Sequence, residues 1–175
     1  MLPAVTAQAK APRGHARRPG LFWATAALVI LLDQTTKELV RSFLDRGEAW
    51  PGADWPVRIH YVTNTGAAFG ILKDQTAFLM VTTLIGLAAI YLYYRNPPFD
   101  HFVASAAVGM MLGGAVGNFA DRVRLGRVTD FIDFPMWPAF NVADSSIFIG
   151  IAVILVGYAL LSRPAARGAP AREEP

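Results

Sequence analysis

Four aspartates and two asparagines stand close together in a chain that is otherwise strongly apolar. They are Asp121, Asp130, Asp133, Asp144, Asn118 and Asn141, all within residues 117–146. Their oxygens could hold a hard cation such as Ca²⁺ or Mg²⁺, or form part of a proton or ion pathway across a membrane. Two close aspartates can instead share one proton, so that one activates water while the other protonates a substrate carbonyl oxygen.

The composition of the chain narrows the choice of function. The chain is 54% hydrophobic and only 17% charged, whereas soluble domains carry about 25% charged residues. The absence of cysteine excludes disulfides, zinc–thiolate sites, iron–sulfur clusters and thiol catalysis. A net charge of +3 without a basic aromatic surface argues against nucleic-acid binding. These features indicate a membrane protein, and we expect no cofactor.

Long apolar runs are the elements that must position the polar set. Four runs are predicted to span a membrane as helices, at about residues 21–40, 76–94, 102–119 and 145–161. The first follows a basic segment, as in a secretory signal peptide, but no small-residue cleavage site comes after it. Small residues at four-residue spacing (Ser105, Gly109, Gly113 and Gly117) predict close helix packing in the third run.

The predicted fold is therefore a membrane all-α protein, a four-transmembrane-helix bundle at residues 21–161 between disordered tails at 1–20 and 162–175. Lysines and arginines number eight on each face, so their total does not orient the bundle. The basic tail before the first span places both termini in the cytoplasm. Span direction then brings Asp33, Lys37, Asn118, Arg122 and Asp144 to the outer face. No ionisable residue lies in the middle of the later spans, which argues against a transporter.

Two outer segments complete the predicted fold. Residues 41–75 contain a β-branched and aromatic stretch followed by Asn-Thr-Gly, which predicts a small extracytoplasmic β-strand element. Residues 135–138 (PMWP) cannot form regular helix and predict a surface loop along the membrane. His60 is the one histidine expected on this face, so a serine–histidine site with Ser145 or Ser146 is disfavoured.

Five motifs carry a resemblance to a known family. They are DQTTK at residues 33–37, NTGAAFG at 64–70, GGAVGNFADR at 113–122, VTDF at 128–131 and FNVAD at 140–144. In this order and on these predicted spans, they resemble the D-x-x-x-K, N-x-G-x-A-F, G-G-A-x-G-N-x-x-D-R, V-x-D-F and F-N-x-A-D motifs of bacterial lipoprotein signal peptidases, the type II signal peptidases. The resemblance covers residues 21–161, and no motif position departs from the family pattern.

The resemblance implies an aspartic endopeptidase of the bacterial inner membrane with its active site near the outer face. Its substrates would be prolipoproteins already carrying diacylglycerol, cleaved just before the lipidated cysteine. Asp130 and Asp144 fall on the family's catalytic pair, and no metal is implied. The supporting or substrate-binding positions are Asn64, Gly66, Asn118, Asp121, Arg122, Asn141, Asp33 and Lys37. We expect membrane lipids as partners and a monomer.

The residue types suggest individual roles. Asn118 and Asn141 would orient the aspartates or bind substrate backbone. Asp33 and Lys37, four residues apart, would form an ion pair at a helix end. Asp144 would be the N-cap of the last helix.

Other roles remain open. Arg122 would either pair with Asp121 or bind a lipid phosphate or a carbonyl, Gly66 would serve backbone geometry, and Asp133 would lie on the surface. The alternative function is a non-enzymatic membrane subunit that binds a metal ion or lipid at the same polar cluster.

Overall fold

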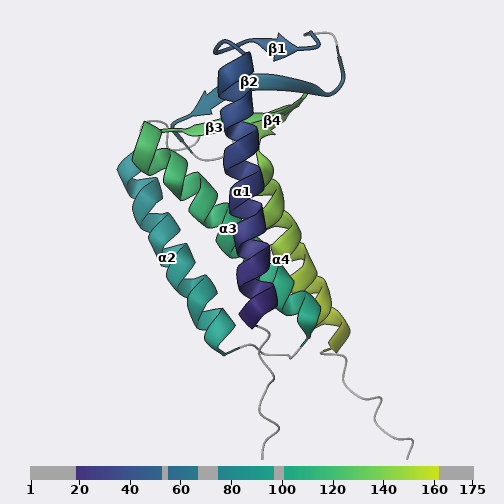
Figure 1. Ribbon diagram of the computed structural model, residues 1–175. Coiled ribbons are helices and arrows are strands. Elements are labelled where there is room, and N and C mark those ends of the chain that lie inside the picture. Colours follow the sequence, from purple (N-terminus) through teal and green to yellow (C-terminus); the bar gives the residue numbers. More distant parts are fainter. Residues whose placement is uncertain (1–18, 53–54, 67–74, 97–100, 162–175) are drawn as a thin grey trace, which may run out of the picture.

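A helical bundle is covered at one end by a small antiparallel sheet (Figure 1). The computed structural model describes residues 19–52, 55–66, 75–96 and 101–161. The elements are α1 (Pro19–Phe43), β1 (Ala49–Trp50), β2 (Arg58–Asn64), α2 (Thr76–Arg95), α3 (Phe102–Leu125), β3 (Val128–Phe134), β4 (Trp137–Phe140) and α4 (Val142–Leu161). The predicted disordered tails lie outside the described residues, except that Pro19 and Gly20 begin α1.

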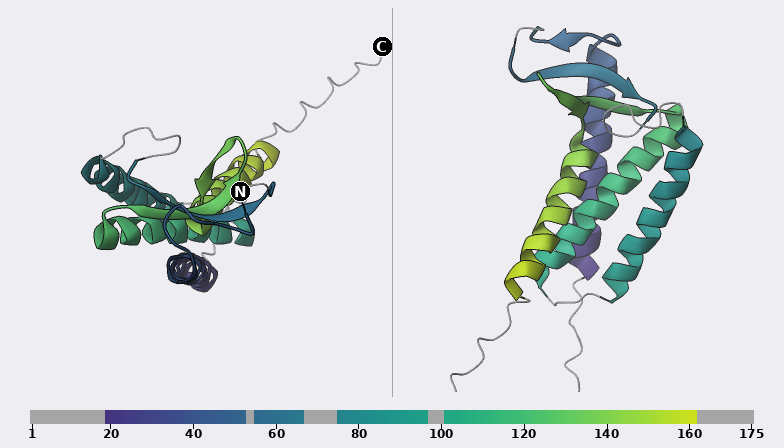
Figure 2. Two further views of the ribbon diagram at one scale, coloured as in Figure 1. Left: turned by 90° about the horizontal axis from the view of Figure 1, so that it is seen from above. Right: turned by 180° about the vertical axis from the view of Figure 1, so that it is seen from behind.

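Three of the described helices are long and apolar enough to cross a membrane. They are α2, α3 and α4, with mean hydropathies of 1.9, 1.5 and 2.0 over their most apolar windows. Helix α1 has 25 residues but carries Asp33 and Lys37, both buried within the bundle. The predicted fourth span therefore stays a prediction. The first turn of α1 and the last turn of α4 lie at the end of the bundle opposite the sheet (Figures 1 and 2).

Helix α3 lies at the centre of the bundle and contacts the other three helices. Its glycines allow close approach. A Cβ atom on Gly109 would lie 2.5 Å from the carbonyl oxygen of Phe22 in α1. On the α4 side, a Cβ atom on Gly114 would overlap the carbonyl oxygen of Ala143. The predicted close packing of the small-residue stripe is confirmed at Gly109, whereas Gly114, on the α4 side, lies outside that stripe.

Replacing a packed glycine tests this explanation. We expect Gly113→Ala to destabilise the protein by about 1–3 kcal/mol, because the new Cβ would lie 2.7 Å from the backbone oxygen of Ala26. Gly86→Ala in α2 is the matched control, because nothing lies within 4 Å of a Cβ there. The control should be as stable as the parent or slightly more stable, since alanine favours helix. Equal thermal unfolding midpoints for the two variants in one detergent would contradict this packing.

The sheet has the strand order β1-β2-β3-β4, with every neighbouring pair antiparallel. Strands β1 and β2 confirm the β element predicted after α1. The surface loop predicted at residues 135–138 is confirmed only in part: Pro135 and Met136 form the exposed turn of the β3–β4 hairpin, whereas Trp137 and Pro138 begin β4. Met136 takes the positive φ of 80° that the turn needs. Pro138 is tolerated because β4 is an edge strand.

Two helix ends differ from the sequence prediction. Helix α3 runs past Phe119 to Leu125, because the polar Asp121 in this stretch is buried against other elements, while the last three residues are exposed. Gly126 then ends the helix in the left-handed conformation, with φ 69°. Helix α4 begins at Val142 instead of Ser145. Both changes place predicted site residues within helix ends, Asp121 and Arg122 at the end of α3 and Asp144 at the start of α4.

Candidate active site

A cavity of about 520 Å³ lies beneath the sheet and brings the two predicted catalytic aspartates together. Asp130 reaches it from β3 and Asp144 from the first turn of α4. The other charged or amide side chains in its lining are Asn64, Asn118 and Arg122. An apolar wall is formed mainly by Trp137, Phe140 and Phe148. The cavity thus combines a compact polar floor with an apolar side.

Amide groups hold Asp130 on both carboxylate oxygens. Its Oδ1 accepts a hydrogen bond from Asn141 Nδ2 at 2.6 Å, and its Oδ2 accepts one from Asn64 Nδ2 at 3.1 Å. Only 3% of the residue is exposed. Burial raises the pKa of the Asp130 carboxyl to about 7, the charge of Asp144 adds to the rise, and the two amide bonds oppose it. The carboxyl therefore gains or loses its proton close to neutral pH.

Asp144 is fixed by the beginning of α4. Its Oδ1 accepts from Asn118 Nδ2 at 2.7 Å. Its Oδ2 accepts from the backbone N–H of Asn141 at 3.3 Å, while Asn141 Oδ1 accepts from the backbone N–H of Asp144 at 3.0 Å. This reciprocal pair is a capping box. The N-cap is therefore Asn141, and the prediction that Asp144 itself caps the helix is wrong because the helix begins earlier.

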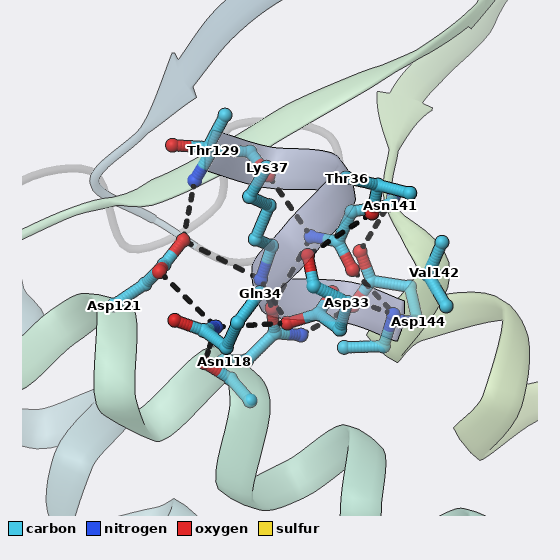
Figure 3. A network of polar contacts seen from close by, with 12 residues as sticks. Asp33, Gln34, Thr36, Lys37, Asn118, Asp121, Thr129, Asn141, Val142 and Asp144 are labelled. Atoms are coloured by element: carbon cyan, nitrogen blue, oxygen red, sulfur yellow. Dashed lines mark hydrogen bonds and ion pairs between the residues drawn. The ribbon is translucent and has the colours of Figure 1, made fainter. Parts of the chain in front are cut away.

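The two asparagines connect the aspartates to each other and to a buried lysine. Figure 3 shows Asn118, Asn141 and Asp144 beside Lys37. Asn118 Oδ1 accepts from Asn141 Nδ2 at 3.2 Å and from Lys37 Nζ at 2.9 Å. Because Lys37 can only donate, it fixes the orientation of the Asn118 amide, whose nitrogen then points to Asp144. The predicted orienting role of Asn118 and Asn141 agrees with these contacts.

Lys37 lies at the centre of a buried ionic network. Its Nζ is 2.9 Å from Asp33 and 3.4 Å from Asp121, and all three side chains are fully buried. Asp33 Oδ1 also accepts from the backbone N–H of Ala143, which ties α1 to the start of α4. The predicted ion pair of Asp33 and Lys37 is confirmed. Its place differs, since it lies inside the bundle under the cavity and is not exposed at a helix end.

Asp121 and Arg122 do not form the ion pair that was one of the two predicted alternatives. Asp121 lies against Lys37 and, at 3.7 Å, Arg41. Arg122 lines the cavity, where its guanidinium is 3.5 Å from the carbonyl oxygen of Gly66. Consecutive helix residues point about 100° apart, so the two side chains leave α3 in different directions.

Asn64 and Gly66 form a local turn at the end of β2. The backbone N–H of Gly66 donates to Asn64 Oδ1 at 2.9 Å, which leaves the Asn64 amide nitrogen directed to Asp130. This contact agrees with the predicted backbone role of Gly66. Residues 67–70 of the same motif lie outside the described residues.

Asp133 is not on the surface as predicted. Only 7% of it is exposed, and its Oδ2 lies 2.5 Å from Arg58 Nε and 3.0 Å from His60 Nδ1 on the neighbouring strand. The prediction fails because these partners are far away in sequence. His60 is thus engaged with Asp133, whereas the Ser145 hydroxyl donates to the carbonyl oxygen of Asn141. No serine–histidine pair forms between these described residues.

Three polar residues of the network were not singled out from the sequence. Gln34 Nε2 donates to Asp33 at 3.0 Å, and Arg41 donates to the Thr129 hydroxyl at 2.9 Å. Spacing would have found Arg41, because it follows Lys37 by four residues, as Lys37 follows Asp33, on one helix face. Within the described part of the chain, no three Asp, Glu or His side chains are grouped to hold a metal ion.

Comparisons with known proteins identify the family of the chain. The family described as signal peptidase (SPase) II matches residues 25–160. The lipoprotein signal peptidase of Caldanaerobacter subterraneus subsp. tengcongensis is 42% identical over 137 residues, covering 77% of this chain and 92% of that protein. That of Syntrophotalea carbinolica is 41% identical over 138 residues, covering 75% and 86%.

Two solved structures also match the fold of this chain. Two bacterial membrane enzymes, determined by the in meso method at 2.3 and 1.9 Å resolution, match with TM-scores of 0.77 and 0.72. They are 30% and 33% identical to this chain, and the matches cover 86% and 83% of it and 94% and 95% of theirs. By sequence and by fold, the chain belongs to the signal peptidase II family.

Proposed function

We propose that the chain removes signal peptides from diacylglyceryl-modified prolipoproteins by an aspartic mechanism, cleaving just before the lipidated cysteine. Its class, a signal peptidase II protease, follows from the family. The observation that carries the mechanism is that Asp130 and Asp144 line one cavity and are each held by asparagine amides. Family membership disfavours the alternative of a non-enzymatic metal- or lipid-binding subunit.

The two carboxyl groups would share one proton during hydrolysis. The ionised carboxylate removes a proton from a water molecule, whose oxygen attacks the scissile carbonyl carbon. The protonated carboxyl donates to the carbonyl oxygen, giving a tetrahedral intermediate. Proton transfer to the amide nitrogen then lets the C–N bond break and the amine leave. Asn64, Asn118 and Asn141 support this cycle by holding both carboxyls without adding charge.

The rest of the cavity suits a lipidated, apolar substrate. Trp137, Phe140 and Phe148 offer an apolar wall beside the aspartates, which we assign to the lipid chains and the apolar part of the signal peptide. Arg122 faces the same space and can bind a carbonyl or phosphate oxygen. Membrane lipids are the surrounding partners in this proposal.

We place the active site near the outer face of the inner membrane, with both termini in the cytoplasm. Helix α1 would be the fourth span, its charged groups neutralised within the buried network. The bundle end opposite the sheet holds the start of α1 and the end of α4 (Figure 2), and the basic residues before α1 favour the cytoplasm.

A processing assay tests this proposal. Purified protein is mixed with a diacylglyceryl-modified prolipoprotein and with the same precursor lacking the lipid, and products are identified by mass. We expect cleavage only of the lipidated precursor, immediately before its modified cysteine, and at the same rate with a chelator present. Loss of activity that a divalent ion restores would favour the metal-dependent alternative.

The pH profile of the reaction is a second test. Because the pKa of Asp130 is raised to about 7, its proton is present below that pH and is lost as the pH rises through it. Above this pH Asp130 is ionised and can no longer act as the general acid. We therefore expect kcat to fall on the alkaline side of pH 7 while the protein stays folded. A profile that stays flat or rises well into the alkaline range would contradict the shared-proton mechanism.

A further inference from the structure

Arg41, near the end of α1, has a largely buried side chain. Its side chain is only 14% exposed, although it does not line the cavity. Its Nε and one terminal nitrogen contact the carboxylate of Glu38, at 3.2 and 2.8 Å, on the exposed side. Its other terminal nitrogen points inward and donates to the Thr129 hydroxyl at 2.9 Å. The guanidinium therefore joins an exposed face of α1 to the buried strand β3.

Thr129 is the residue directly before Asp130, and three of its polar groups are fixed. Its hydroxyl accepts from Arg41, and its backbone N–H donates to Asp121 Oδ2 at 3.0 Å. Its carbonyl oxygen accepts from Asn141 Nδ2 at 3.3 Å. Thr129 is 1% exposed, so each of these contacts is made away from bulk solvent. Thr129 is thus hydrogen-bonded to one residue of α1, one of α3 and the residue just before α4.

We infer that Arg41 is a positioning residue that fixes the carboxyl of Asp130 through Thr129. This inference rests on the proposed role of Asp130. Helix α1 contributes no residue to the cavity lining. Arg41 therefore acts on Asp130 indirectly, through its hydrogen bond to the preceding residue, Thr129. A shift of about 1 Å in a reacting group can cost on the order of a hundredfold in rate. Loss of the arginine should therefore slow the chemical step more than it weakens substrate binding.

Kinetics of matched variants test the inference. We expect Arg41→Gln to lower kcat for the lipidated precursor roughly 10- to 100-fold, with KM within about threefold of the parent. Thr129→Val removes the acceptor while keeping the shape and should lower kcat in the same direction. The double variant should be no slower than Arg41→Gln alone, because that change already breaks the Arg41–Thr129 contact, along with the ion pairs of Arg41 to Asp121 and Glu38. Glu38→Gln removes only the exposed ion pair and should stay within about threefold of the parent.

Several outcomes would overturn the inference. One is a parental kcat in either single variant. Another is a double variant whose loss in kcat equals the product of the two single losses. A third is a loss of activity that appears in KM instead of kcat. A purely structural role predicts lower unfolding midpoints with an unchanged kcat for the folded enzyme, so midpoints are measured alongside. If Arg41→Gln does not fold, Thr129→Val decides alone.

The same assay separates this inference from the proposed function. If Asp130→Asn keeps activity, the proposed catalytic pair fails, whatever Arg41 does. If Asp130→Asn is inactive while Arg41→Gln and Thr129→Val turn over at the parental rate, the catalytic pair stands and only the positioning role of Arg41 fails.

Discussion

Asp130→Asn and Asp144→Asn should each reduce the rate of prolipoprotein cleavage by roughly 10³-fold or more, to near background. An amide cannot accept the proton of the attacking water or return a proton to the substrate, so either change breaks the cycle. Because the two groups act as one unit, the double variant should be hardly slower than either single variant. The measurement is the initial rate with saturating lipidated precursor, normalised to the amount of folded protein.

Asp133→Asn is the matched control, because it changes a buried aspartate of the same strand that faces away from the cavity. Asp133 pairs with Arg58 and His60 instead of lining the cavity. We expect the Asp133→Asn variant to be less stable than the parent, while its rate of prolipoprotein cleavage per folded molecule stays within about threefold of the parental rate. A fully active Asp130→Asn or Asp144→Asn variant would refute the catalytic pair. Inactivity of Asp133→Asn in the folded state would show that the assay does not distinguish the carboxylates.

Lys37→Met should have the largest effect on stability, about 3–5 kcal/mol. The substitution leaves Asp33 and Asp121 buried without the ammonium group that lies 2.9 and 3.4 Å from them. It also removes the donor that orients Asn118, which in turn holds Asp144. The unfolding midpoint in detergent and the residual rate of the folded fraction should therefore both fall.

Two variants show whether charge is the cause. Glu38→Gln alters an exposed charge one residue further along α1 and should change stability by less than about 1 kcal/mol. Adding Asp33→Asn to Lys37→Met removes one of the stranded charges and should recover part of the lost stability. If Lys37→Met unfolds at the parental midpoint, the ionic network does not contribute to folding as described.

The helices could be predicted from the sequence because each depends on local properties. Apolar runs of spanning length gave α2 with nearly its observed bounds, Thr76–Arg95. Prediction failed where polar residues continue a helix, as at the end of α3, since hydropathy alone does not record the burial of Asp121 against other elements. The β3–β4 hairpin was missed because its two prolines indicate irregular chain unless one knows that β4 lies at the sheet edge.

The candidate site was predicted less from composition than from motif spacing. Topology brought the polar residues to one end of the bundle, but it could not separate Asp130 from Asp133. That separation depends on which face of β3 each occupies and on partners in β2, more than sixty residues away. For the same reason the sequence did not reveal that Thr129 connects Arg41 to the site. Long-range pairing, unlike helix formation, leaves little local signal.

The close glycine contacts of α3 restrict insertions and deletions within this helix. Gly109 and Gly114 place the backbone of α3 directly against α1 and α4, and the same helix carries Asn118 and Asp121 nearer its C-terminal end. Inserting or deleting one residue between the glycines and Asn118 would rotate that end by about 100° and carry Asn118 away from Asp144. Homologous chains should therefore differ in this helix by substitution alone, while insertions and deletions gather in the connections between the helices.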